Sequence, residues 1–386
     1  MHKAGRADRR TGFIMKRRGF GKIVVAAFLL AGLVVFVAFV VRRWGGEEER
    51  VFRKFSAEFF DTFDTHVSFT AFAQGEAEFG RYSDILHGEM SRLHRLFDIY
   101  NDYDGLVNMK TINDHAGGEP LRADSSIIEL LEVAKEAYSD AGGAVNVALG
   151  PVLSIWHDRR ERALAGGDAS VPSLTELLAA AVHVSVGDIL VDRDRSTVSL
   201  RYGDMRLDVG ALAKGYAVQK AVERLRQAGL RSGLINAGGN VVVIGAPLDG
   251  RDAWNIGVHA PDGDLSKLLD VLRLTDGAAV TSGSDQRYFT VGGRRWHHII
   301  DPKTLFPAES VKSVTVLHPD STVADVLSTA AFILPQTEAR ALIAKKGAEA
   351  VWVTADNRLI MTSGYRRLSK IAQDNDAQER SGDEKP

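Results

Sequence analysis

A run of nineteen residues without a single polar side chain constrains this chain more than any other segment. Ile23 to Val41 read IVVAAFLLAGLVVFVAFVV. As a helix rising 1.5 Å per residue, this run nearly matches a hydrocarbon layer of ~30 Å. A buried core helix is the alternative, but core helices seldom lack every polar residue. The run therefore predicts a transmembrane anchor or an export signal.

The flank before this run is strongly basic. Residues 1–22 carry eight Lys or Arg residues against one acid, and such an excess stays cytoplasmic by the positive-inside tendency. Arg17 and Arg18 also resemble a twin-arginine export motif, with Met15 as an alternative start. No small-x-small cleavage site follows Val41. We therefore expect an uncleaved single-pass anchor in the inner (cytoplasmic) membrane, with the remaining chain outside the cytoplasm.

Charge and composition exclude several classes of function. The chain has no cysteine, so disulfides, thiolate metal sites and cysteine nucleophiles are absent. From residue 44 onward, 38 basic residues face 49 acidic ones. This acidity argues against nucleic acid as a partner, because neutralising phosphates requires clustered cations, and it suits a protein that handles a divalent cation. Dinucleotide-binding, P-loop, metallopeptidase and serine-hydrolase motifs are also absent.

The pattern of apolar residues favours an α+β fold. Short β-rich runs outnumber helices and are interleaved with them irregularly, which predicts a single large domain over residues 55–365 with mixed sheets and flanking helices. Residues 42–54 are expected to form a linker, and residues 366–386 a disordered polar tail. Helices are expected at Gly80–Phe97, Ser125–Ala141, Lys214–Ala228 and Ala324–Ile333. Strands are expected at Phe63–Phe72, twice within Val182–Tyr202, and at Leu234–Ile244, Trp254–His259, Val271–Thr275, Tyr288–Val291, Ser313–Leu317 and the hairpin Ala350–Met361.

Two glycine-containing segments could meet a ligand. Leu207 to Gly215 read LDVGALAKG at a strand-to-helix junction, where amides, a carboxylate and a cation could face a phosphorylated ligand. An ordinary tight turn, with Asp208 at the helix start and Lys214 in solvent, is equally open. Farther along, Asn236–Asn240 interrupt an apolar strand. Glycine there indicates either a bulge that curves the sheet or a close backbone approach to a ligand.

Paired histidines end a predicted hairpin strand. His297 and His298 precede Ile299, Ile300, Asp301 and Pro302. Because neighbouring strand residues point to opposite faces, at most one of the two should face a given site, where it could act as a base near pH 7. Two structural histidines are the alternative. Zinc is disfavoured, since no Cys and no further His lies at ligand spacing.

Asp325 and Thr329 are four residues apart in a predicted helix, so both side chains lie on one face. A carboxylate and a hydroxyl are hard oxygen ligands that suit Mg²⁺. Alternatively, Asp325 is an acid near the helix start and Thr329 a core hydroxyl.

Taken in order, the segments LDVGALAKGYA, LINAGGN, W-x-I-G, TSG…RYF, HHIIDP and ADVLSTA resemble the ApbE-like flavin transferases, over roughly Phe63 to Val353. The resemblance implies an α+β domain that binds FAD and uses Mg²⁺ to move FMN onto a Thr or Ser hydroxyl of a partner protein, with release of AMP. The implied acceptors are exported flavoproteins of respiratory or electron-transfer systems.

The resemblance also implies site residues. The metal ligands would be the Ala211 carbonyl, Asp325 and Thr329, and the catalytic residues would be His298 and Lys214. Two positions depart from the commoner family pattern: Asn146 replaces an Asp, and Phe63 replaces a Met. The residues implied to contact FAD are Phe63, Tyr100, Ala144, Val145, Asn146, Asp208, Lys214, His298 and Ile299.

Two other functions remain open at this level. The same site could hydrolyse FAD as a Mg²⁺-dependent pyrophosphatase, with water in place of the acceptor hydroxyl. A non-catalytic, membrane-anchored flavin-binding protein is the other alternative, but loss of the metal pair would be its signature, and Asp325 and Thr329 are present.

The basic flank generates a topology prediction. Protease added to spheroplasts should digest the residues after Trp44, because the basic flank keeps only the first residues in the cytoplasm. Immunoblotting against the C-terminal part would measure this, with a cytoplasmic protein as the protected control. Protection of the domain until the inner membrane is lysed would contradict the predicted orientation.

Overall fold

The computed structural model describes residues 51–262, 264 and 267–374. The predicted anchor at 23–41, the basic residues 1–22 and the last twelve residues lie outside this part of the chain, so the predictions made for them stay predictions. Among the described residues, none of the helices combines the length and apolar character needed to cross a bilayer.

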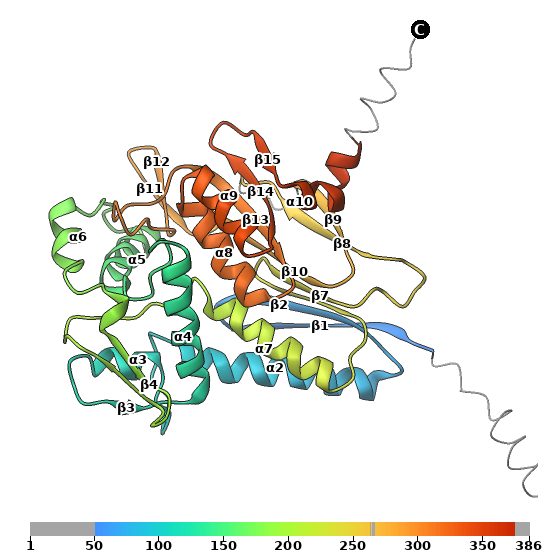
Figure 1. Cartoon of the computed structure of the whole chain (residues 1–386), viewed down its shortest axis with the longest axis horizontal. Coiled ribbons are helices and arrows are strands. Elements are labelled where there is room, and N and C mark those ends of the chain that lie inside the picture. Colours follow the sequence, from blue (N-terminus) through green and yellow to red (C-terminus); the bar gives the residue numbers. More distant parts are fainter. Residues whose placement is uncertain (1–50, 263, 265–266, 375–386) are drawn as a thin grey trace, which may run out of the picture. The chain divides into compact units, whose positions relative to one another are not determined.

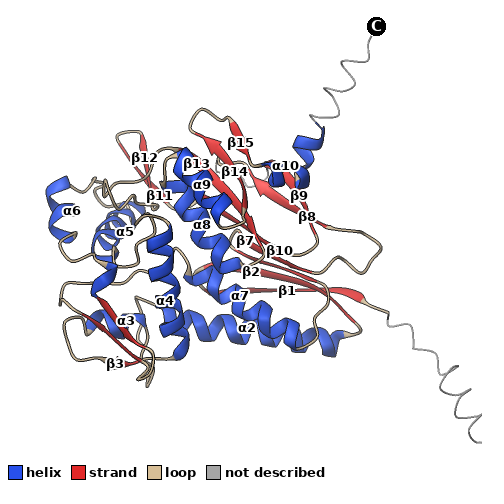
Figure 2. Ribbon diagram, in the orientation of Figure 1, coloured by secondary structure: helices blue, strands red, loops and turns tan. Residues whose placement is uncertain are grey.

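An eight-stranded sheet forms the centre of the described chain (Figures 1 and 2). Every pair of neighbouring strands in it is antiparallel. In sheet order the strands are β1 (Arg53–Thr62), β2 (Thr65–Ala73), β6 (Gly233–Ala237), β7 (Asn240–Ile244), β10 (Gly277–Gly283), β13 (Val311–His318), β14 (Glu349–Thr354) and β15 (Leu359–Met361). This arrangement confirms the α+β prediction.

Both faces of this sheet are buried, each by its own hydrophobic core. Successive strand residues point to opposite sides and so belong to different cores. Val280, Val314 and Trp352 face a large core, whereas their neighbours Ala279 and Val351 face a smaller one. The large core lies against helices α2 (Glu76–Phe97), α7 (Ala213–Gln227), α8 (Ser321–Ile333) and α9 (Gln336–Lys345). The smaller core is covered by β8 (Trp254–His259), β9 (Leu268–Leu274) and α10 (Ser363–Leu368).

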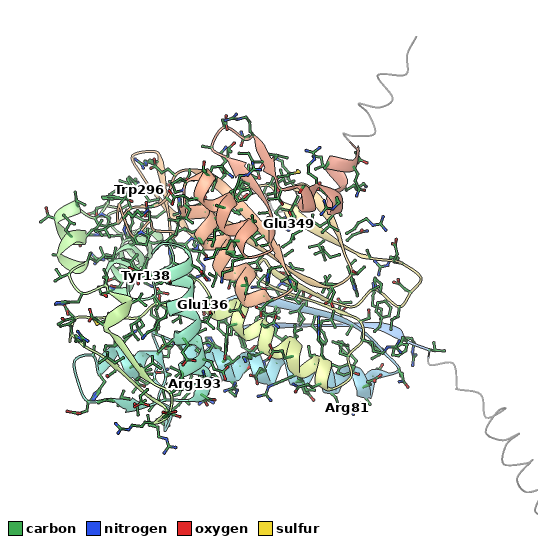
Figure 3. The ribbon with its side chains drawn as sticks, viewed as in Figure 1. Arg81, Glu136, Tyr138, Arg193, Trp296 and Glu349 are labelled. Atoms are coloured by element: carbon green, nitrogen blue, oxygen red, sulfur yellow. The ribbon has the colours of Figure 1, made fainter. Side chains whose placement is uncertain are left out.

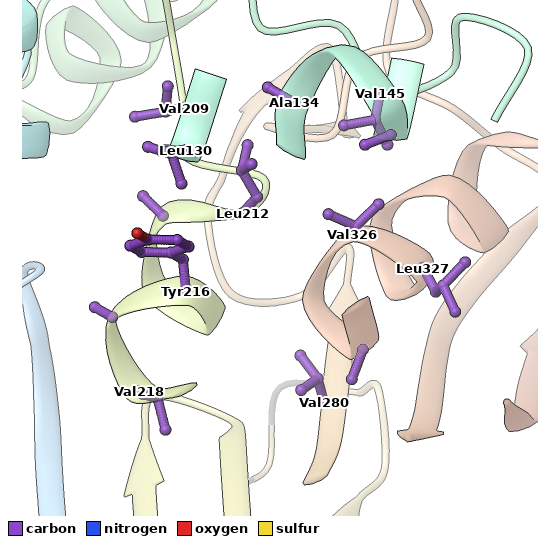
Figure 4. Packing of buried hydrophobic residues seen from close by; sticks show 14 of the residues in the cluster. Leu130, Ala134, Val145, Val209, Leu212, Tyr216, Val218, Val280, Val326 and Leu327 are labelled. Atoms are coloured by element: carbon purple, nitrogen blue, oxygen red, sulfur yellow. The ribbon is translucent and has the colours of Figure 1, made fainter. Parts of the chain in front are cut away.

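The large core also joins the sheet to a mainly helical region. Figure 4 shows Leu130 from this region beside Tyr216 of α7, and Val145 beside Val326 of α8. The region comprises α3 (Met109–Asp114), α4 (Ser125–Asp140), α5 (Gly150–Leu164), α6 (Leu174–Ala180), η1 (Val186–Asp188), and the small sheet of β3 (Leu121–Arg122), β5 (Thr197–Leu200) and β4 (Ile189–Asp192).

A separate hairpin packs on α5. It consists of β11 (Tyr288–Val291) and β12 (Arg294–His297). Trp296, labelled in Figure 3, stacks on Trp156 of α5 with ring centroids 5.7 Å apart. Trp156 in turn donates its indole N–H to the Leu305 carbonyl at 2.9 Å. This aromatic contact fixes the histidines at the end of β12 relative to α5.

Several predicted boundaries were wrong. Strand β1 begins at Arg53, inside the predicted linker, and Phe63 lies in the β1–β2 turn, where it and Asp64 have φ of 53° and 47°. Strand β10 and helix α5 were not predicted: β10 is mostly Gly, Ala, Thr and Ser, and α5 is polar over its second half. The predicted tail also begins within folded structure, since Ala372 is buried and the Ile371 amide donates to Asp270 at 3.2 Å.

Candidate functional site

The loop from Leu207 to Leu212 makes up most of the predicted ligand-binding segment and leads directly into α7. The Asp208 amide donates to the Val147 carbonyl at 2.8 Å, and its carboxylate accepts from the Gly210 amide at 2.8 Å. The backbone amide of Leu207 donates to Oδ1 of Asn113, and Nδ2 of Asn113 donates to the Leu207 carbonyl. The segment is therefore a tight turn that is anchored on both sides before the helix begins.

A hydrogen bond from an α7 amide to an α8 carboxylate joins these two helices. The Gly215 amide donates to Oδ2 of Asp325 at 2.7 Å, and Asp325 is only 6% exposed. A Cβ at Gly215 would lie 2.5 Å from the Asp325 Cβ and 2.6 Å from the Ser321 carbonyl oxygen. Only glycine lets the two helices approach this closely.

Oxygens beside this bond are available for a cation. Gly215 is the third residue of α7, a position whose amide has no acceptor within a regular helix, and the Asp325 carboxylate accepts it. Within the described residues, the Ala211 carbonyl, Oδ1 of Asp325 and the half-buried Thr329 hydroxyl have no hydrogen-bond partner. Carbonyl, carboxylate and hydroxyl oxygens together fit a hard cation such as Mg²⁺. The same part of the chain holds no cluster of three or more His, Cys, Asp or Glu residues suited to a metal.

Burial shifts the charges beside these oxygens. It raises the pKa of Asp325, which the charge of Lys214 partly opposes. It lowers the pKa of Lys214, against the opposing charge of Asp325. Contact with an ion of opposite sign would favour the charged form of each group.

Lys214 reaches across to the glycine pair that interrupts the apolar segment. Its ammonium donates to the Gly238 carbonyl at 3.2 Å. Gly238 and Gly239, with φ of 55° and 86°, form the two-residue turn that joins β6 to β7. The segment predicted as one strand is therefore two strands, and the glycines form a turn and not a bulge. A Cβ at Gly238 would lie 1.9 Å from the Thr65 hydroxyl, which brings the β1–β2 turn to the same place.

The two histidines lie in different environments, as their alternation predicts. His297 is buried, donates from Nε2 to the Ala308 carbonyl at 2.8 Å and accepts the Ile299 amide on Nδ1 at 3.2 Å. His298 is exposed and donates from Nδ1 to the Arg287 carbonyl at 3.2 Å. This bond requires the proton on Nδ1 and leaves Nε2 of a neutral ring free to accept a proton.

His298 is recessed among protein atoms even though its surface is accessible. Burial lowers its pKa to about 3, with the charges of Arg287 and His297 acting in the same direction. The ring is therefore neutral at pH 7. An anion bound nearby would raise this pKa, because it would favour the charged imidazolium.

Tyr100 belongs to the same group of residues. Burial of its hydroxyl, and secondly the charge of Asp208, raise its pKa to about 12, although the residue is 53% exposed. Its ring centroid lies 5.2 Å from that of His157. The charges of Arg160 and Arg287 also act on Tyr100. The structure thus brings Tyr100, Asp208, Lys214 and His298 into one electrostatic environment.

Four other candidate residues are buried or bound to the backbone of their own surroundings. Ala144, Val145 and Ile299 are buried apolar side chains. Asn146 donates from Nδ2 to the Val184 carbonyl at 2.9 Å and accepts the Ala148 amide at 2.9 Å. An aspartate could not donate the first of these bonds, so Asn146 supports the fold here.

Phe63 lies in its turn with its ring edge-on to His94, at 5.5 Å between centroids. Its neighbour Asp64 is close enough for its charge to act on Tyr100. This turn therefore lies near the Tyr100 side of the site.

The sequence analysis missed His157 and Arg160, because it did not predict α5. The Arg160 guanidinium lies 2.9 Å from Nδ1 of His157, and its charge acts on His298. Both residues are one helical turn apart on α5, and this spacing, within a correctly predicted helix, was the signal that could have found them.

Most of the chain is similar to known proteins. The model of the ApbE family matches residues 63–352. The FAD:protein FMN transferase of Klebsiella pneumoniae (strain 342) is 31% identical over 281 residues, which cover 70% of this chain and 85% of that protein. That of Treponema pallidum (strain Nichols) is 37% identical over 266 residues, covering 66% and 73%.

Solved structures share the fold. The ApbE protein of Thermotoga maritima aligns with a TM-score of 0.72 at 28% identity, covering 82% of this chain and all of that one. The flavin transferase ApbE of Vibrio cholerae aligns with a TM-score of 0.70 at 20% identity, with the same coverage.

The contact between α7 and α8 generates a stability prediction. Gly215→Ala should cost roughly 1–3 kcal/mol of unfolding free energy, because the added methyl overpacks the helix contact, and it should weaken divalent-cation binding by displacing Asp325. Urea unfolding and calorimetry measure these two effects. The matched control is Gly88→Ala in α2, where a Cβ meets nothing within 4 Å. That change should stabilise by about 0.5–1 kcal/mol. Equal behaviour of the two variants would refute the close-contact argument.

Proposed function

Because the chain belongs to the ApbE family, we propose that it is a Mg²⁺-dependent, membrane-anchored FAD:protein FMN transferase that modifies a Thr or Ser hydroxyl of an exported flavoprotein and releases AMP. FAD:protein FMN transfer is the activity that the family and its named relatives carry. The metal, the acceptor hydroxyl, the residue roles and the location are the proposal.

The observation that supports the metal most directly is the set of unpartnered oxygens around Asp325. The Ala211 carbonyl, the Asp325 carboxylate and the Thr329 hydroxyl would hold Mg²⁺, and the last two lie four residues apart on α8. When bound, Mg²⁺ would neutralise charge on the diphosphate and position it. The Lys214 ammonium beside this set would add a second positive charge for the phosphate oxygens.

The reaction requires one bond to form and one to break at the FMN-side phosphorus. The acceptor hydroxyl oxygen attacks that phosphorus, and the bond to the AMP phosphate breaks, so AMP leaves with the electron pair. The hydroxyl proton passes to a base. Nε2 of His298 is the candidate, since its ring is neutral and Nδ1–H is held by the Arg287 carbonyl. An alcohol is a poor acid at pH 7, so proton transfer accompanies bond formation.

The location follows from the sequence outside the described residues. The basic flank and apolar run at 1–41 favour an anchor with the catalytic domain outside the cytoplasm. Acceptors would then be exported flavoproteins of electron-transfer systems.

Incubation with FAD, Mg²⁺ and a purified acceptor domain tests the proposed function. Mass spectrometry should show one FMN added to the acceptor, at a Thr or Ser, together with free AMP. Release of free FMN and AMP at the same rate, without modified acceptor, would indicate FAD hydrolysis instead. Binding of FAD without either product would indicate a non-catalytic flavin-binding protein.

The free Nε2 generates a kinetic prediction. His298→Ala should lower the single-turnover transfer rate by roughly 10²–10⁴ and leave FAD affinity within a few-fold, because a general base acts mainly in the transition state. His297→Ala is the matched control and should affect stability more than transfer, since its ring is buried against Phe332. If His298→Ala transfers at full rate once saturated with FAD, the base is another group.

The metal set generates a second prediction. Asp325→Asn should abolish transfer and cation binding while keeping the fold, because the amide oxygen can still accept the Gly215 N–H and only the charge is lost. Asp325→Ala should lose both the charge and the bond. Turnover across a Mg²⁺ titration, with urea unfolding in parallel, measures the difference. Near-normal activity of Asp325→Asn at low Mg²⁺ would remove Asp325 from the metal site.

A further inference from the structure

Arg287 is held next to His298 by its own backbone. It lies between the end of β10 and the start of β11, and its carbonyl accepts both the His298 amide, at 3.1 Å, and Nδ1–H of His298, at 3.2 Å. These two bonds fix the position of Arg287 relative to the ring. The side chain therefore starts from a defined point at the edge of the site.

The Arg287 guanidinium is exposed and has no hydrogen bond or ion pair within the described part of the chain. Nearby arginines differ in this respect. Arg160 pairs with Glu161, Arg294 pairs with Glu309, and the Arg295 guanidinium lies 4.7 Å from the centre of the Tyr288 ring. An unpaired guanidinium beside a functional site offers five donors to an anion.

The charge of Arg287 reaches several predicted site residues. It acts on Asp208, Lys214, His298 and Tyr100, which come from three different segments. It lies close enough to Lys214 to disfavour the protonated amine. Two neighbouring cations, one of them without a partner, are stabilised when an anion binds between them.

We propose that Arg287 binds the diphosphate of FAD together with Lys214, so that the FMN-side phosphorus is held next to His298. A guanidinium matches phosphate oxygens in a bidentate manner, which orients the group as well as attracting it. The assignment rests on the proposed function for the identity of the ligand, and it makes Arg287 a substrate-contacting residue of the site.

Binding measurements on the full-length chain test this inference without relying on transfer. Calorimetry in EDTA compares FAD with riboflavin, which lacks phosphate. Arg287→Gln should weaken FAD binding roughly 10- to 100-fold and leave riboflavin binding within two-fold. Arg287→Lys should lie between, because a point charge replaces the bidentate fork. Arg295→Gln is the matched control, with the same change of charge on the adjacent hairpin, and should bind both ligands as the unmodified chain does.

Two results would overturn the proposal. FAD affinity unchanged in Arg287→Gln would show that the guanidinium does not meet the diphosphate. An equal loss for FAD and riboflavin would show a structural role through the His298 backbone bonds. Failure of the unmodified chain to modify any acceptor would contradict the transferase proposal alone, since the comparison of FAD with riboflavin does not depend on turnover.

Discussion

The hydrogen bond from the Gly215 amide to the Asp325 carboxylate joins the two helices on which the site depends. It brings the first turn of α7 against α8, and with it the loop that carries Asp208 and the Ala211 carbonyl. It also supplies an acceptor for an amide in the first turn of α7, which has none within the helix. A single missing Cβ therefore decides how closely the two helices pack.

The antiparallel sheet determines which loops meet this helix contact. The β1–β2 and β6–β7 turns belong to neighbouring hairpins, and the contact between Gly238 and Thr65 places them side by side. Lys214 donates a hydrogen bond to the Gly238 carbonyl in the β6–β7 turn. The β11–β12 hairpin reaches the same region from another direction, because Trp296 stacks on Trp156 of α5. Four segments distant in sequence thus contribute groups to one place.

Burial disfavours the charged forms of four ionisable side chains at this site. They are Asp208, Lys214, His298 and Asp325. Such an arrangement costs stability in the free protein, and oppositely charged ligands relieve it. A divalent cation and a diphosphate, the ligands of the proposed reaction, are of this kind.

The sequence by itself determined the local features of this protein. Apolar periodicity predicted α4, α7 and the end of α8, and turn residues predicted the β14–β15 hairpin. The order of short motifs identified the family and made Asp208, Lys214, His298 and Asp325 candidate site residues. These features depend on neighbours in the chain, as propensity and alternation do. Tertiary structure decided the rest. Strand β10, rich in small residues, is a strand only because β7 and β13 pair with it, and polar α5 is positioned by Trp156. The bond of the Gly215 amide to Asp325 and the tautomer of His298 arise from contacts between residues 110 and 11 positions apart in the chain. A local pattern in the sequence does not specify such contacts, because they form only when the whole chain has packed.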